Sequence, residues 1–250
     1  MAHTTVPLAT GDGTCNTALF ESGGSGAKPA VVFFTDGGGP RPSQFSMAER
    51  LASHGYLVVM PDLFHRVGPY DPRILWAMVM DPKRKQEWRD KFYASATNQH
   101  NFQTDVTAVL QYLTRRGDVL DRVGTTGYCM GGNLSLRAAG RFPDRVAAAA
   151  SFHGGGLAGD SPDSPHLLAP QMKARVYVAS AVEDGSFPEA MKQRLEDALT
   201  AAKVEHVIET YAGARHGFCV SDSPAYDPAA SERHWTALLG LLRRTLKGQA

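Results

Sequence analysis

Along most of this chain, short apolar runs alternate with stretches in which apolar residues recur at helical spacing. A short continuous apolar run is typical of a strand that is covered on both faces. Such strands alternating with helices predict an α/β fold: a mostly parallel central sheet flanked by helices. The predicted strands are 30–34, 56–60, 123–126, 146–152, 176–181 and 204–210, and the predicted helices are 43–54, 98–115, 131–141, 187–202 and 228–247.

Two segments depart from this alternation. Residues 3–9 and 15–21 alternate between polar and apolar side chains around Gly11-Asp12-Gly13, which predicts a hairpin. Residues 61–98 hold four prolines, two of the three tryptophans and a dense run of charges, which predicts a small helical insertion acting as a lid or substrate-binding region. We therefore expect residues 1–250 to form a single domain with this one insertion.

Composition excludes several classes of protein. The 26 Lys and Arg residues balance 25 Asp and Glu residues, so nothing favours binding to nucleic acid or to an anionic membrane. Three cysteines are an odd number in a chain too long to need disulfides, and the N-terminus has no basic stretch followed by an apolar run. We expect a cytoplasmic protein whose partner is a small molecule. No histidine pair has a convincing metal-ligand spacing, so no metal is predicted.

Residues 123–134 have the pattern of a strand, a sharp turn and a helix, with Gly127, Cys129 and Gly131 at the turn. The spacing has a steric reason, because a nucleophile in a strained turn needs flanking glycines that let strand and helix approach each other. The N–H of Met130, at the helix N-terminus, can then donate to a developing oxyanion. We predict Cys129 as a nucleophile; the alternative is a small buried side chain between helix-packing glycines.

A cysteine needs a base or a favourable field to attack as the thiolate at neutral pH. His216 lies in the loop between the last predicted strand and the last predicted helix, where a base can reach Cys129. The loop after the preceding strand supplies two adjacent carboxylates, and we favour Asp184 over Glu183 as the group that orients His216.

The remaining cysteines and histidines carry weaker signals. Cys15 and Cys219 lie in apolar or strand-like surroundings and are predicted to be structural. His65 and His153 each follow a strand and can line the pocket, where a supporting or structural role is favoured over direct chemistry. His153 is counted among the predicted substrate-binding residues.

Together these residues resemble the dienelactone hydrolase family, a branch of the α/β-hydrolase fold. The resemblance runs from the strand at Ala30 to the final helix and rests on three motifs: Gly-Tyr-Cys-Met-Gly-Gly at 127–132, Gly-Tyr-Leu-Val-Val-Met-Pro-Asp-Leu-Phe at 55–64 and Gly-Ala-Arg-His-Gly-Phe at 213–218. The order Cys129, Asp184, His216 is also that of α/β-hydrolases. The first motif is the most specific, because this family is unusual in having cysteine at the turn.

The resemblance implies a carboxymethylenebutenolidase-like carboxylic ester hydrolase that opens a lactone or enol ester without a cofactor. It implies that Cys129 attacks and forms a thioester, that His216 carries the proton, and that Asp184 holds His216. Gly37 N–H is implied as the second oxyanion donor beside Met130, and Asp36 as a carboxylate near the resting thiol. The run Asp36-Gly37-Gly38-Gly39 equally suits a tight turn.

In the family's prototype, an Arg and a Tyr in the insertion and a second Arg after the histidine bind the substrate carboxylate. Arg89 and Tyr93 have the matching separation, although Arg89 equally suits a solvated helix face. Val220 stands where the second Arg is expected. Because a charge-assisted contact is lost there, we expect a natural substrate other than a dienelactone dianion.

The function expected from the sequence is therefore hydrolysis of a small-molecule ester or lactone by a monomer or small homo-oligomer. Two alternatives stay open: a thioesterase or acyl transferase using the same three residues, and a non-catalytic ligand-binding member of the fold.

Overall fold

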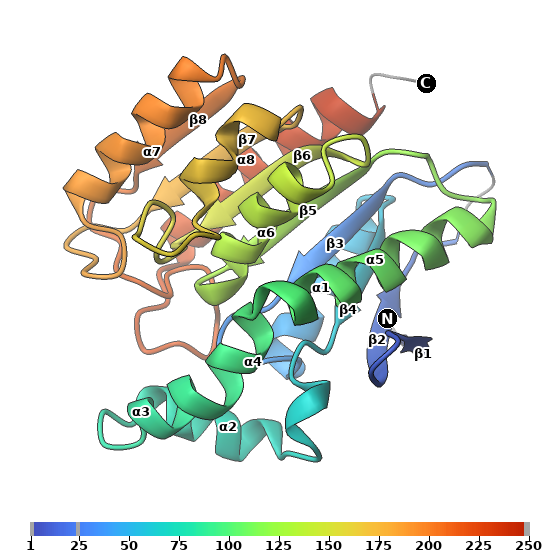
Figure 1. Ribbon diagram of the computed structural model, residues 1–250, viewed down its shortest axis with the longest axis horizontal. Coiled ribbons are helices and arrows are strands. Elements are labelled where there is room, and N and C mark those ends of the chain that lie inside the picture. The colour runs from blue at the N-terminus through green and yellow to red at the C-terminus, as the bar shows by residue number, and fades with distance from the viewer. Residues whose placement is uncertain (1–2, 24–25, 248–250) are drawn as a thin grey trace. The chain divides into compact units, whose positions relative to one another are not determined.

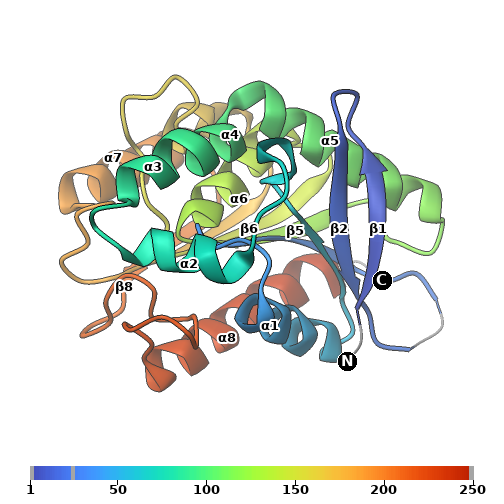
Figure 2. The ribbon, with the colours of Figure 1, turned by 90° about the horizontal axis from the view of Figure 1, so that it is seen from below.

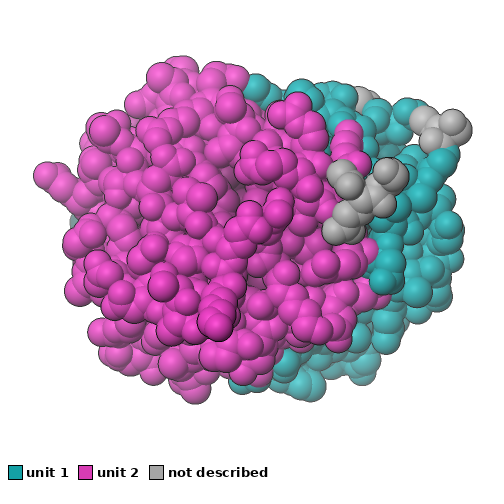
Figure 3. Space-filling model, turned by 90° about the horizontal axis from the view of Figure 1, so that it is seen from above, with its two compact units in different colours: residues 1–121 teal, residues 122–250 magenta. Residues whose placement is uncertain are grey.

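The strands fall into two groups of four in the computed structural model, which describes residues 3–23 and 26–247 (Figure 1). The contacts of the chain divide it into two units, residues 1–121 and 122–250, which Figure 3 colours separately. The first unit holds β1 to β4 and the second holds β5 to β8.

The first unit begins with the predicted hairpin. Its strands are β1 (Thr4–Ala9), β2 (Thr14–Phe20), β3 (Ala30–Phe34) and β4 (Leu57–Pro61). They lie in the order β1-β2-β4-β3. Strand β2 is antiparallel to both of its neighbours, β1 and β4, and β3 is parallel to β4. Every residue of β3 and β4 is buried, as their uninterrupted apolar sequences predict.

The helices of the first unit are α1 (Pro42–Ser53), α2 (Pro72–Met80), α3 (Lys85–Trp88), α4 (Ala94–Thr97) and α5 (Gln99–Arg116), with a 3-10 turn η1 (His65–Val67) and a π turn η2 (Arg89–Tyr93). Helices α1 and α5 lie on opposite faces of the strands of this unit (Figure 2). The short helices α2 to α4 occupy the predicted insertion at 61–98, as expected.

The second unit repeats strand and helix regularly. Its strands β5 (Val123–Tyr128), β6 (Val146–Phe152), β7 (Arg175–Ser180) and β8 (His206–Thr210) are parallel and adjacent in that order. Its helices are α6 (Met130–Arg141), α7 (Glu189–Ala201) and α8 (Pro228–Leu242), with a 3-10 helix η3 (Pro165–Gln171) and a π turn η4 (Arg243–Lys247). Helices α6 and α7 cover one face of these strands and α8 covers the other (Figures 1 and 2).

The predicted elements are all present, with small errors at their ends. The strand predicted from 204 begins at His206, because the Val204 N–H still bonds the Leu199 carbonyl at the end of α7. The last α-helix ends at Leu242 rather than at residue 247, because residues 243–247 form the π turn η4. Within residues 3–23 and 26–247, none of the helices has the length and apolar character needed to cross a membrane.

Because β5 to β8 are parallel, their carboxyl ends share one edge of this unit. Cys129 follows β5, His153 follows β6, Asp184 comes after β7 and His216 after β8. The topology of the second unit therefore gathers four of the predicted site residues at one edge.

Candidate active site

Cys129 sits at a strained turn between β5 and α6. Its backbone has φ 54° and ψ −115°, a conformation that residues with a Cβ rarely adopt. The turn is tight enough that a Cβ added to Gly127 would lie 1.9 Å from the Gly131 carbonyl oxygen. A Cβ on Gly132 would lie 2.8 Å from the Gly154 Cα. The glycines of the motif are thus required by close approach of the backbone, as the sequence suggested.

The three cysteines differ in their exposure. Cys129 is partly exposed, whereas Cys15 and Cys219 are buried. Burial, together with the charge of Asp105, raises the pKa of Cys15 to about 12, and burial raises the pKa of Cys219 well above its ordinary value. Of the three cysteines, Cys129 is therefore the one that is accessible to solvent.

His216 is oriented by Asp184. The Nδ1 atom of His216 lies 2.7 Å from Oδ2 of Asp184. The other carboxylate oxygen accepts two hydrogen bonds from Ser186, from its N–H at 2.9 Å and its Oγ at 2.6 Å. Burial opposes ionisation of Asp184, but the bonds from His216 and Ser186 outweigh it and lower the pKa of Asp184 to about 2. Asp184 is therefore a carboxylate fixed in place on both oxygens.

The Cys129 sulfur also acts on the imidazole of His216. Burial disfavours the charged ring, but the Cys129 sulfur and the Asp184 carboxylate outweigh burial and raise the pKa of His216 to about 10. Since Nδ1 is held by Asp184, Nε2 is the ring nitrogen left for the sulfur. The arrangement favours the protonated form of the His216 ring.

Met130 and His153 complete the surroundings of Cys129. Met130 is the first residue of α6, where backbone N–H groups have no acceptor within the helix. His153 lies beneath the turn, 1% exposed, and its Nδ1 is 3.1 Å from the Cys129 N–H. Burial and the neighbouring His216 and His234 hold the pKa of His153 well below its usual range, so its ring is neutral.

The predicted loop residues Asp36 and Gly37 follow β3 in the first unit. Asp36 is 4% exposed, and its carboxylate makes a bidentate ion pair with the Arg41 guanidinium, at 2.6 and 2.8 Å. It also accepts hydrogen bonds from the Gly38 N–H at 2.9 Å and from Gln44 Nε2 at 3.1 Å. These four bonds show that the Asp36 carboxylate stabilises the turn after β3. Its contact with the Cys129 thiol stays a prediction.

Trp88, from the insertion, covers Gly37. Its indole N–H donates to the Gly37 carbonyl at 2.9 Å, and a Cβ on Gly37 would lie 2.5 Å from the ring. The insertion therefore fixes the peptide at Gly37, whose N–H is the predicted second oxyanion donor.

The other predicted substrate-binding residues, Arg89 and Tyr93, lie in the π turn η2. Arg89 is exposed, and the half-buried Tyr93 ring lies 5.3 Å from that of Trp88. Val220 is 1% exposed, so its side chain belongs to the core. The roles of Arg89 and Tyr93 in substrate binding stay predictions.

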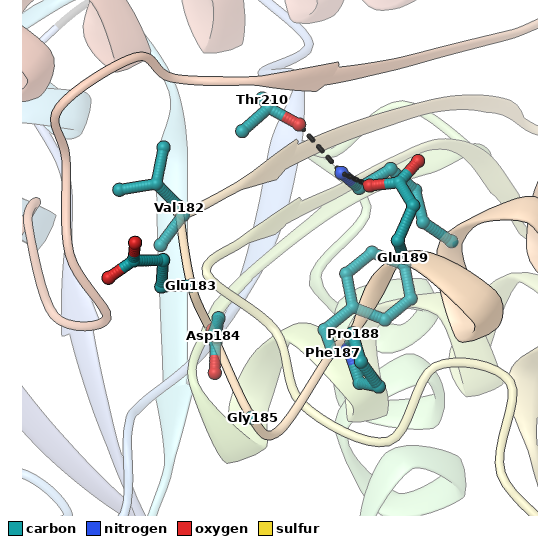
Figure 4. A pocket seen from close by; sticks show the side chains of 10 residues that line it. Val182, Glu183, Asp184, Gly185, Phe187, Pro188, Glu189 and Thr210 are labelled. Carbon is teal, nitrogen blue, oxygen red and sulfur yellow. Dashed lines mark hydrogen bonds and ion pairs between the residues drawn. The ribbon is translucent and has the colours of Figure 1, made fainter.

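Two cavities flank the loop that carries Asp184. One, of about 450 Å³, has Thr210, Glu189 and Phe187 on its wall (Figure 4). The other, of about 410 Å³, is lined by Asp184, His216 and Arg215. The second cavity gives solvent-sized molecules access to the side of the histidine and its carboxylate.

Sequence reasoning missed two contributors to this geometry. Ser186 Oγ donates to Asp184 and lies 3.3 Å from His216 Nδ1. The signal for it was the Asp-Gly-Ser sequence, because an aspartate often accepts from the backbone N–H two residues later. Trp88 gave no local signal, since its partner lies 51 residues earlier.

The model of the dienelactone hydrolase family matches residues 16–246. A Synechocystis protein provisionally named as a carboxymethylenebutenolidase is 27% identical over 89% of this chain and 88% of its own length. A human protein named "Carboxymethylenebutenolidase homolog" is 26% identical over 77% of this chain and 71% of its own length.

Similarity to solved structures extends over nearly the whole chain. The structure of a provisionally named dienelactone hydrolase from Klebsiella pneumoniae superposes with a TM-score of 0.82, at 22% identity, covering 97% of this chain and 99% of the other. A structural match of that extent shows the fold. The chain has the α/β-hydrolase fold and belongs to the dienelactone hydrolase family of hydrolases.

Proposed function

We propose that this protein hydrolyses a small carboxylic ester or lactone through a thioester on Cys129, with His216 as the proton carrier and Asp184 as its orienting group. The proposal rests on the placement of the three side chains: His216 Nδ1 lies 2.7 Å from Asp184 Oδ2, and the Cys129 sulfur is close enough to His216 to help raise its pKa. The family's hydrolase character supports it, as do the names of the curated relatives.

The first half of the proposed reaction acylates the cysteine. The Cys129 thiolate attacks the carbonyl carbon, and the C=O electron pair moves onto oxygen, where the Met130 N–H at the start of α6 donates to it. The tetrahedral species collapses by breaking its bond to the alkoxy oxygen, which takes the proton from His216 Nε2. A lactone stays attached through the acyl group, whereas an open ester releases its alcohol.

The second half hydrolyses the thioester. Now neutral, His216 removes a proton from water, and the resulting hydroxide attacks the thioester carbonyl carbon. Collapse breaks the carbon–sulfur bond, releases the carboxylic acid and returns Cys129 as a thiolate beside a protonated His216. Asp184 stays ionised throughout, and its role is to hold the ring and stabilise its charge.

The decisive experiment measures steady-state turnover of a panel of lactones, aryl esters and acyl thioesters by the wild type and by Cys129→Ala. We expect the variant to lose at least about 10⁴-fold in kcat. The matched control is Cys15→Ala, the same substitution at a buried cysteine in β2, for which kcat should stay within about twofold.

Two further results discriminate the alternatives. Mass spectrometry of quenched wild-type reactions should find the acyl group on the peptide that contains Cys129. Faster turnover of acyl thioesters than of every lactone and ester would replace the proposed substrate class by a thioesterase. Turnover by Cys129→Ala at the wild-type rate would refute Cys129 as the nucleophile.

A further inference from the structure

His153 is a buried histidine that the proposed reaction does not use as an acid or a base. It is the first residue of the loop after β6, and its ring contacts the backbone of Cys129 and the ring of His216. Its Nδ1 lies 3.1 Å from the Cys129 N–H, and its ring centroid lies 5.0 Å from that of His216. Among the described residues of the second unit, no other histidine contacts both Cys129 and His216.

The hydrogen bond at Nδ1 fixes the proton of the neutral ring. Because Nδ1 accepts from the Cys129 N–H, the ring proton must be on Nε2. That atom is buried and has no hydrogen-bond partner among residues 3–23 and 26–247. Its surroundings are aromatic, with the Phe218 ring centroid at 5.1 Å.

An unpaired buried N–H costs free energy that a phenylalanine or leucine in the same place would not incur. The backbone of His153 adds to the cost, with φ 40°. Because a histidine at this position is destabilising in both respects, we expect its side chain to have a role that offsets the cost. The hydrogen bond that Nδ1 accepts is such a role. Nδ1 accepts from the N–H of Cys129, which also donates to the Phe152 carbonyl at 3.1 Å, and the backbone of Cys129 has φ 54°.

The loop that His153 begins also joins the turn to the loop carrying Asp184. Asn133, in α6, donates through Nδ2 to the carbonyl oxygens of Gly155 and Gly156, at 3.3 and 2.9 Å. The Gly156 N–H in turn donates to the Ser186 carbonyl at 2.8 Å. The segment 153–156 thus connects the helix after the nucleophile to the residue that holds Asp184.

We propose that His153 is a positioning residue: its Nδ1 holds the backbone of Cys129 in the strained conformation from which the sulfur meets His216, and its ring supports the His216 imidazole. The proposal rests on the proposed function insofar as it concerns attack by Cys129. It assigns no contact between His153 and substrate, in contrast to the substrate-binding role expected from the sequence.

Two substitutions of His153 distinguish the effect of losing the hydrogen-bond acceptor from the effect of straining the backbone. Asparagine tolerates positive φ and can place its side-chain oxygen where Nδ1 now lies, so His153→Asn keeps the acceptor. Glycine tolerates positive φ without an acceptor, so His153→Gly removes it without backbone strain. Comparing the two variants therefore tests the hydrogen bond.

The first measurement is the rate at which iodoacetamide alkylates Cys129, followed by peptide mass spectrometry with the buried Cys15 and Cys219 as internal references. We expect about a tenfold slower reaction in His153→Gly and a rate within about threefold of wild type in His153→Asn. With an aryl ester, kcat should fall by the same factor while KM stays within about twofold.

The alkylation rate does not depend on hydrolysis. If the wild type turns over no ester, lactone or thioester, the proposed function fails while the alkylation comparison still decides the role of His153. An unchanged rate in His153→Gly, or equal losses in both variants, would overturn the positioning role.

A measurement on the unmodified protein covers the case in which His153→Gly does not fold. The ¹⁵N NMR spectrum of the histidine side chains should show a protonated Nε2 and an unprotonated Nδ1 for His153, assigned by its absence in His153→Asn. The opposite tautomer, or a doubly protonated ring at neutral pH, would remove the acceptor and overturn the proposal.

Discussion

Both units of the molecule bring a cysteine, a histidine and an aspartate into the same neighbourhood. In the first unit, His65 Nε2 lies 3.1 Å from Oδ1 of Asp105, and the charge of Asp105 helps to raise the pKa of the buried Cys15 to about 12. In the second, His216 Nδ1 lies 2.7 Å from Asp184. The residue types and the histidine–carboxylate distances are similar, so other features must distinguish the two sets.

The carboxylates differ in their partners. Arg66 binds both oxygens of Asp105, at 2.9 Å each, and also pairs with Asp12, so the carboxylate of the first unit is neutralised by a guanidinium. The partners of Asp184 are the neutral Ser186 and the histidine itself. Its negative charge is therefore available to stabilise a protonated imidazole.

The cysteines differ in their backbone and exposure. Cys15 lies within the regular strand β2, 1% exposed, and its thiol donates to the Asp62 carbonyl at 3.5 Å. Cys129 lies at a strained turn and is partly exposed. A Cys, His and Asp set thus has the features of a catalytic site only where the turn presents the sulfur and no arginine shares the carboxylate with the histidine.

The largest expected effect tests the two carboxylates. Asp184→Asn should lower kcat for an aryl ester by about 10³- to 10⁴-fold, because the ring loses the group that fixes its tautomer and stabilises its charge. Asp105→Asn is the matched control, for which we expect kcat within about threefold of wild type.

The control should instead lose stability. Asp105 is 1% exposed and pairs with Arg66 and His65, so its replacement should lower the free energy of unfolding by about 3 kcal/mol, measured by urea denaturation. If Asp184→Asn retains wild-type kcat, the distinction drawn between the two carboxylates is wrong.

The second prediction concerns the strained turn. In Gly127→Ala the new Cβ would meet the Gly131 carbonyl oxygen at 1.9 Å, and a backbone atom cannot move aside as a side chain can. We expect a loss of at least about 3 kcal/mol in the free energy of unfolding, by urea denaturation. Gly185→Ala, where nothing lies within 4 Å of the new Cβ, is the control and should change stability by less than about 1 kcal/mol. Equal stabilities of the two variants would contradict the close packing described for the turn.

Much of the fold follows from the sequence because strand and helix alternate with clear boundaries. Strands 30–34 and 146–152 are predicted to the residue, since each is an uninterrupted run of small or apolar residues that is buried throughout. Ends are less certain where an apolar residue belongs to a neighbouring element. Val204 is such a case, because its side chain is buried but its N–H closes α7.

The candidate residues at the edge of the second unit are also predictable, because parallel strands place their following loops together. What the sequence could not reveal are contacts set by tertiary packing. The pairing of Asp36 with Arg41 depends on how the turn folds back, and the bond from Trp88 to Gly37 joins positions 51 residues apart. For His153 the position after a strand was recognisable, whereas its bond to the Cys129 N–H needs the geometry of two adjacent loops.

The smallest expected effect is a shift in one titration, and it tests whether the Cys129 sulfur acts on the charge of the His216 ring. Burial lowers the affinity of His216 for a proton, and the largest opposing influence is the Cys129 sulfur, followed by Asp184; together they raise the pKa to about 10. Replacing Cys129 with alanine should therefore lower the pKa of His216, measured by NMR of the ring protons, whereas Cys15→Ala should leave it unchanged.

The raised pKa of His216 also makes the free energy of unfolding depend on pH. Since the pKa of His216 in the folded protein lies above the ordinary 6.5, its protonated ring stabilises the fold fully below pH 6.5, and that contribution is lost as the pH rises through about 10. In Cys129→Ala the loss should occur at lower pH, because the folded-state pKa is closer to the ordinary value. The comparison is made by urea denaturation of both proteins between pH 6 and pH 10. Identical pH dependence in the two proteins would mean that the Cys129 sulfur does not stabilise the charged His216 ring, which would contradict the interaction described for the two side chains.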